Sequence, residues 1–226
     1  MTALLAAAIL FVGSHFLLSH PLRAPLVRAM GERVFLLFYS LVAAVTLGVL
    51  VVVYRARPMT PLLWPVGDAL WAVATIVMLL ASVLLIGSLL GNPALPTGGG
   101  PATVPERARG VYAITRHPMM WAFALWAGVH AAIYPTADNI VLVAAIAVLA
   151  LVGAALQDRK KKAIQPGWRD WEARTSYWPF AAIARGRARL AGFRPHDLAG
   201  GVVLWLAATW AHLPLAGWAA GVWRWV

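Results

Sequence analysis

Six long apolar runs constrain the fold of this chain more than any other feature of its sequence. They cover residues 2–19, 34–54, 67–90, 118–135, 138–157 and 199–222. A helix needs about 20 apolar residues to cross the hydrocarbon core of a bilayer, where each backbone polar group must be paired inside the structure. The runs therefore predict an all-α, polytopic membrane bundle of about six transmembrane helices, forming a single domain over residues 1–226.

The composition fits a surface covered by lipid. Hydrophobic residues make up 62% of the chain and charged residues 12%, whereas soluble domains have roughly 25% charged residues. The net charge of +11 could suggest nucleic acid, but no recognisable nucleic-acid module accompanies it. We therefore expect membrane lipids, and no nucleic acid, as partners. The chain has no cysteine, so a metal or haem would need His, Met or oxygen ligands.

Basic residues are distributed unevenly between the two sides of the predicted bundle. Sixteen of the nineteen Lys and Arg residues fall in the connections 20–33, 91–117 and 158–198. Positive residues accumulate in cytoplasmic loops, so we expect these connections to be cytoplasmic and both termini to lie outside a bacterial-type cytoplasmic (inner) membrane. No basic residue precedes the first run, which favours an uncleaved span over a signal peptide.

Two connections carry local structural signals. The segment 91–110 is rich in Pro and Gly, which predicts an irregular cytoplasmic loop. Residues 135–138, Pro-Thr-Ala-Asp, form a connection so short that the fourth and fifth runs are expected to make a helical hairpin.

Three histidines lie inside apolar runs, where an ionisable side chain is costly and usually faces the bundle interior. They are His15, His130 and His212. Met119, Phe123 and Trp126 precede His130 at helical spacing, so all four share one face. Such a stripe could hold a porphyrin, with the imidazole as axial ligand. The alternative is a packing histidine bonded to a neighbouring helix, but three such histidines in one small bundle favour a cofactor site.

The tripeptide Arg116-His117-Pro118 marks the point where a cytoplasmic loop enters the fourth run. Pro suits the first turn of a helix, where its missing N–H costs little. Two interpretations of the corner remain open. It is an interfacial helix entry with Arg116 extended toward lipid phosphates, or it binds an anionic cofactor group such as a haem propionate, which a guanidinium matches well.

Several segments resemble the NnrU family of membrane proteins, whose name comes from denitrification. They are "FVGSHFLLSHPLRAPLVRAMGERVFLLFYSLVA", "GVYAITRHPMMWAFALWAGVHA", "TSYWPFAAIARGR" and "WAHLPLAG". The resemblance covers most of the chain, and its most specific part is the Arg-His-Pro motif leading into the fourth run. It implies a polytopic membrane protein with a redox or denitrification-linked role.

The same family resembles zeta-carotene isomerase, a haem b membrane enzyme that isomerises a carotenoid double bond. This resemblance implies a haem b held by His15 and His130, and an apolar polyene as substrate. The relative has a cysteine three residues before its helix-four histidine, where this chain has Ala127. Ligand exchange that depends on a thiol is therefore excluded here, which puts the isomerase activity itself in doubt.

Depth in the bilayer suggests a different pair of ligands. At about 1.5 Å per residue, His15 lies roughly 20 Å from the outer end of its run, and His130 only about 7 Å from the outer end of its own. His212 enters from the cytoplasmic side and lies about 20 Å in, near the level of His130 in a core about 30 Å thick. Depth thus favours His130 with His212, while the resemblance favours His15 with His130. Helix tilt could close the difference in depth, so we expect His15 and His130 as the haem ligands and keep His212 as the alternative partner of His130.

Two other functions remain open. An Arg-His-Pro helix entry, a helical hairpin and a downstream Gly-x-x-x-Trp segment also resemble the isoprenylcysteine and phospholipid methyltransferases, which bind S-adenosylmethionine. Those enzymes have a Glu pair where this chain has residues 157–162, Gln-Asp-Arg-Lys-Lys-Lys. The third possibility is an accessory or assembly subunit of a respiratory or photosynthetic membrane complex.

Overall fold

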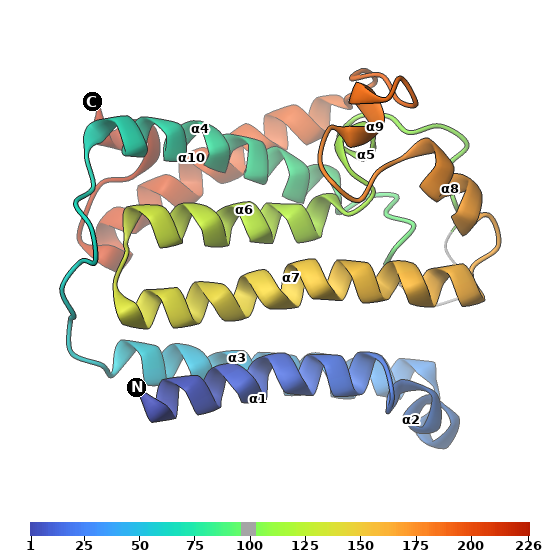
Figure 1. The fold of residues 1–226 in the computed structure, drawn as a ribbon, viewed down its shortest axis with the longest axis horizontal. Helices are drawn as coiled ribbons and strands as arrows, with labels where there is room; N and C mark the ends of the chain where they lie inside the picture. Colours follow the sequence, from blue (N-terminus) through green and yellow to red (C-terminus); the bar gives the residue numbers. More distant parts are fainter. Residues whose placement is uncertain (96–102) are drawn as a thin grey trace.

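The computed structural model describes residues 1–95 and 103–226, and its long helices lie side by side (Figure 1). The elements are α1 (Thr2–Ser19), α2 (Arg23–Met30), α3 (Glu32–Arg55), α4 (Asp68–Gly87), α5 (Val111–Ile114), α6 (Pro118–Ile133), α7 (Ala137–Ile164), α8 (Trp168–Arg174), α9 (Ala181–Ala184), α10 (Pro195–Ala216) and the 3₁₀ helix η1 (Gly221–Arg224). No strand occurs in the described part of the chain, which confirms the predicted all-α class.

Five helices are long and apolar enough to cross a membrane, namely α1, α3, α4, α7 and α10. The fourth predicted span, 118–135, is the shorter apolar helix α6 of 16 residues. Its length of about 24 Å falls short of a hydrocarbon core of about 30 Å. The helix ends early because Pro135 follows and the residue before a proline is biased away from helical geometry. The five long apolar helices, together with the shorter α6, make the fold a polytopic helical membrane bundle.

Several helices begin or end a few residues away from the predicted span boundaries. The fifth run was expected to end at residue 157, but α7 continues to Ile164, because Arg and Lys are good helix formers and a helix does not stop where its apolar stretch ends. The last helix covers 195–216 instead of 199–222. It begins at Pro195, where Asp197 and Arg194 form reciprocal capping bonds, and ends before Gly217 in the left-handed conformation. The third predicted span was expected to reach residue 90, but helix α4 ends at Gly87.

The described parts of the connections expected on the cytoplasmic side lie at one end of the bundle. Figure 1 shows α2, α5, α8 and α9 there, a region we call the loop end. Both termini, the connection 56–67 and the tight α6–α7 turn lie at the other end. Within the 91–110 segment, residues 96–102 lie outside the described part of the chain. The short helices α2, α8 and α9 show that 20–33 and 158–198 are partly helical.

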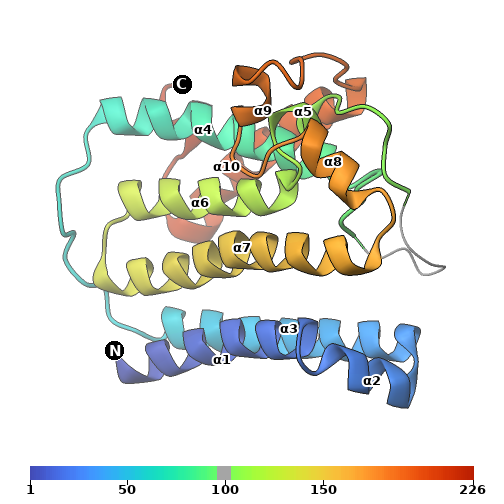
Figure 2. The same cartoon turned by 45° about the vertical axis from the view of Figure 1, so that its right-hand side comes forward.

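The helices form three layers in both views (Figures 1 and 2), with α1 and α3 on one side, α6 and α7 in the middle, and α4 and α10 on the other side. One apolar cluster joins α1, α3 and α7 and includes Phe11 and Leu50. A second apolar cluster lies toward the loop end, where Trp168 and Trp171 of α8 cluster with buried residues of α4 and α5. The two clusters hold the outer layers to the middle one.

Candidate functional site

The structure brings two of the three membrane histidines together. His130 near the end of α6 and His212 in α10 have ring centroids 6.0 Å apart, with an angle of 31° between the ring planes. Both helices pack against α4, which places the two side chains next to each other. This proximity agrees with the depth argument from the sequence, which put these two histidines near the same level.

The tautomer of each ring follows from its hydrogen bond. His130 Nδ1 lies 2.8 Å from the carbonyl oxygen of Trp126, and His212 Nδ1 lies 2.7 Å from that of Ala208. A carbonyl oxygen can only accept, so each Nδ1 carries the proton. Each neutral ring then keeps the lone pair on Nε2, the nitrogen that is free to bind a metal. The ring of Trp126 stacks on that of His130 with centroids 4.2 Å apart.

His15 lies in a different environment. Its Nδ1 also donates to the carbonyl four residues earlier, Phe11, at 2.7 Å. Among the described residues its ring contacts are with Phe11 and Tyr39. It lines a pocket together with Phe123, and His130 lies seven residues further along α6, about 10 Å by helical rise. The structure therefore places His130 beside His212, while His15 faces a separate space.

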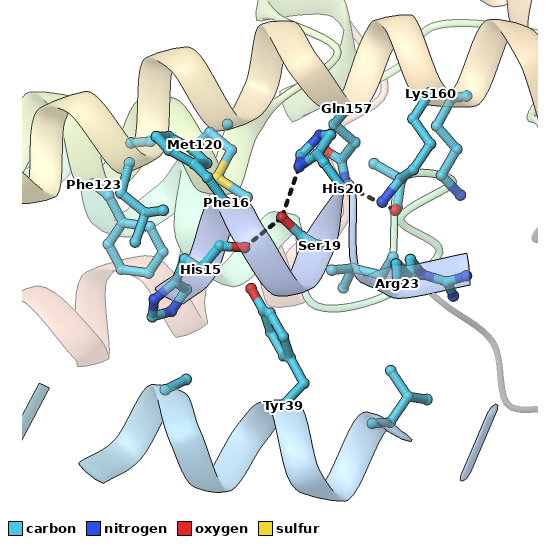
Figure 3. Close-up of a pocket in the computed structure, with 18 of the residues that line it drawn as sticks. His15, Phe16, Ser19, His20, Arg23, Tyr39, Met120, Phe123, Gln157 and Lys160 are labelled. Atoms are coloured by element: carbon cyan, nitrogen blue, oxygen red, sulfur yellow. Dashed lines mark hydrogen bonds between the residues drawn. The ribbon is translucent and has the colours of Figure 1, made fainter. Parts of the chain in front are cut away.

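That space is a pocket of about 940 Å³, which we call the α1–α3–α7 pocket after its main walls. Met120 and Phe123 of α6 close it from one side. Figure 3 shows His15 and Phe123 in one part of the pocket and Arg23 and Lys160 in another, toward the loop end. At that end, burial lowers the pKa of His20, and the positive charge of Lys160 lowers it further.

The Arg116-His117 corner is bound to an acidic residue of the same chain. Arg116 donates to both carboxylate oxygens of Asp158 in α7, with the shortest distance 2.5 Å. The Nε2 of His117 lies 2.8 Å from the same carboxylate, and Glu172 of α8 lies 3.5 Å from Arg116. The side chain of His117 is only 1% exposed. The charge of the corner is thus neutralised internally, which favours a structural helix entry over an anion-binding site.

Asp158 is the residue of this cluster that the sequence reasoning missed. It was assigned to a cytoplasmic loop, but it lies in α7 and faces the entry of α6. A usable signal was present, because Asp158 is the first charged residue after an apolar run and is followed by four basic residues. An acid in such surroundings is expected to have a specific partner.

The donor set limits how a metal could be held. Within residues 1–95 and 103–226, no three His, Asp or Glu side chains gather into a possible metal site. An ion bound by His130 and His212 would therefore need further ligands other than His, Asp or Glu side chains. A porphyrin supplies four nitrogens in its plane and leaves two axial positions for imidazoles.

Helix length and hydropathy make this chain a multi-pass membrane protein, with a histidine pair between two of its helices. The family model described as NnrU protein matches residues 3–220, and the chain belongs to this family. No curated protein and no solved structure matched the chain in our comparisons.

Proposed function

We propose that this NnrU-family protein binds haem b, with His130 and His212 as the two axial ligands. The proposal is carried by one observation, the 6.0 Å separation of two imidazole rings whose Nδ1 atoms are both occupied by backbone carbonyls. In many metal sites the second nitrogen of a ligating histidine is bonded in this way, which fixes the tautomer and the ring orientation.

The separation of the rings is compatible with two ligands of a single metal ion. With imidazole–metal bonds of about 2 Å, two rings on opposite sides of one ion have centroids about 6 Å apart. Trp126, stacked on His130, supplies a flat apolar wall beside the ligand. Helices α6 and α10 are joined through α4, so a planar group between them could be held without separating a tightly packed interface.

Bound in this way, haem b would supply one-electron chemistry, because two imidazoles fill both axial positions. This supports a redox role more strongly than isomerisation of a polyene, which requires the substrate to reach the reacting group. Ala127 in place of a cysteine provides no thiol for ligand exchange. A carotenoid-isomerase-like activity and a denitrification-linked role remain predictions from the family resemblance.

The pair His15 and His130, implied by the resemblance, is the alternative ligand set. It is favoured by the α1–α3–α7 pocket, which His15 lines and which has room for a large group. It is opposed by the distance along α6 between His130 and the residues that line this pocket. The two ligand sets differ in their second histidine, and substitution distinguishes them.

The test is the absorption spectrum of the purified protein, expressed with haem supplied and recorded with and without dithionite. We expect a low-spin b-type spectrum, strongly altered or lost in both His130→Ala and His212→Ala. His15→Ala should retain it, as should the control His196→Ala at the loop end. Loss in His15→Ala with retention in His212→Ala would establish the alternative pair. Wild-type protein without a Soret band would refute haem binding altogether.

A further inference from the structure

The α1–α3–α7 pocket has one apolar part and one charged part. Its deeper walls are formed by Ala43, Leu47, Ile146 and Leu149, together with the aromatic rings of Phe11 and Phe123. Its loop-end walls carry Ser19, His20, Arg23, Glu32, Gln157, Lys160 and Lys161. This division fits a molecule with a long apolar part and a polar head facing the loop end.

The length of the pocket agrees with one leaflet of a bilayer. Its lining residues on α3 extend from Glu32 to Leu47, and those on α7 from Ile146 to Ile164. The ends of these stretches are 15 and 18 residues apart, which corresponds to about 22 and 27 Å of helix. Half of a hydrocarbon core is about 15 Å, and the headgroup region adds roughly 5 to 7 Å. The pocket is therefore long enough for one amphiphile from the loop-side leaflet, and its α7 wall extends somewhat beyond the headgroup region.

The charges at the loop end favour an acidic head. Three basic side chains line the pocket there against a single carboxylate, that of Glu32, which pairs with Arg23 at 2.5 Å. Lys161 is directed to the carbonyl oxygen of Pro93 at 3.2 Å. Lys160 forms no salt bridge with any residue in the described ranges; Arg23 and Lys161 lie close enough to repel it electrostatically, and the Glu32 carboxylate offsets only part of this repulsion. An anion at this point would relieve that repulsion.

We propose that the α1–α3–α7 pocket binds one anionic amphiphile, with its apolar chain between α3 and α7 and its acidic head at Lys160 and Arg23. The chemistry required is a phosphate or carboxylate on a chain about one leaflet long. Both an anionic phospholipid and a free long-chain acid provide it. This site is separate from the His130–His212 pair and does not depend on haem binding there.

Native mass spectrometry of the full-length protein in detergent tests the proposal. The probes are phosphatidylglycerol and phosphatidylcholine with identical chains, and oleic acid. We expect wild type to retain phosphatidylglycerol over phosphatidylcholine, and Lys160→Gln to reduce this preference about fivefold, the effect of one basic side chain near an anionic headgroup. The matched control is Lys162→Gln on the same helix, which pairs with Glu172 and does not line the pocket.

A second variant tests the apolar part independently of charge. Ala43→Phe would fill the space between α3 and α7, and retention of every probe should fall.

A competition experiment identifies the ligand. Displacement of phosphatidylglycerol by oleic acid would identify a free long-chain acid as the preferred ligand, and resistance to displacement would identify the phospholipid. Equal retention of both phospholipids, or equal effects of Lys160→Gln and Lys162→Gln, would overturn the proposal. Loss of a haem spectrum in Lys160→Gln would also overturn it, since the basic residues would then serve haem propionates.

Discussion

The guanidinium of Arg116 and the carboxylate of Asp158, 42 residues apart in the chain, form a two-pronged ion pair with N–O distances of 2.5 to 3.0 Å. The pair ties the residues just before α6 to the loop-end half of α7. Both side chains are nearly buried, at 11% and 8% exposure. A buried charge that loses its partner is strongly destabilising, so this contact fixes the helix that carries His130.

Asp158→Ala should therefore destabilise the protein markedly. We expect the free energy of unfolding in detergent, measured by denaturant titration, to fall by about 3–5 kcal/mol, because Arg116 would lose its nearest carboxylate. The control is Glu32→Ala, which breaks the more exposed pair with Arg23 and should cost about 0–1 kcal/mol. Similar losses in the two variants would mean that the Arg116–Asp158 pair does not anchor α6.

S-adenosylmethionine should not bind stoichiometrically to this protein. The resemblance to membrane methyltransferases depends on the Arg-His-Pro entry, but His117 is 1% exposed and its Nε2 is occupied by Asp158. Isothermal titration calorimetry of the detergent-solubilised protein is the measurement. A micromolar site with one ligand per chain, abolished by His117→Ala, would favour the methyltransferase interpretation instead.

The orientation in the membrane is a further expected outcome. The connections that hold sixteen of the nineteen basic residues lie at the loop end, with α2, α5, α8 and α9 (Figure 1). Positive loops are retained in the cytoplasm. Alkaline phosphatase fused within 56–67 should be active, and a fusion within 185–194 should be inactive. Green fluorescent protein at the same two positions should give the opposite pattern. Activity of the phosphatase within 185–194 would reverse the proposed topology.

The sequence was most informative where one physical requirement dominated. Apolar length predicted the membrane helices, and the short 135–138 connection predicted the α6–α7 hairpin, where Thr136 accepts from the backbone N–H of Asn139 as an N-cap. Helical rise alone put His130 and His212 near one level, and their rings lie 6.0 Å apart. These features depend on local geometry and on the thickness of the bilayer, both of which can be estimated from the sequence.

Features that depend on tertiary packing could not be predicted in the same way. The extension of α7 beyond residue 157 places Asp158 on a helix that meets the entry of α6, and no local pattern links that residue to Arg116. The α1–α3–α7 pocket likewise collects residues from five helices and three connections. In the sequence, the basic residues at the loop end of this pocket indicated only which side of the membrane the connections face.

The packing of α10 on α4 provides the last prediction. Gly201 of α10 approaches Val83 so closely that a Cβ at this glycine would lie 2.7 Å from the Cα of Val83. Small residues permit such contacts between membrane helices, and backbone atoms cannot move aside as a flexible side chain can. Gly201→Ala should lower the free energy of unfolding by about 1–3 kcal/mol through overpacking.

Gly48→Ala in α3, where no heavy atom lies within 4 Å of the added Cβ, is the control and should be neutral or stabilise the protein by up to about 1 kcal/mol. Denaturant titration of both variants in the same detergent makes the comparison. Equal stability of Gly201→Ala and wild type would show that α10 can shift away from α4, and the distance between His130 and His212 would then not be fixed by this contact.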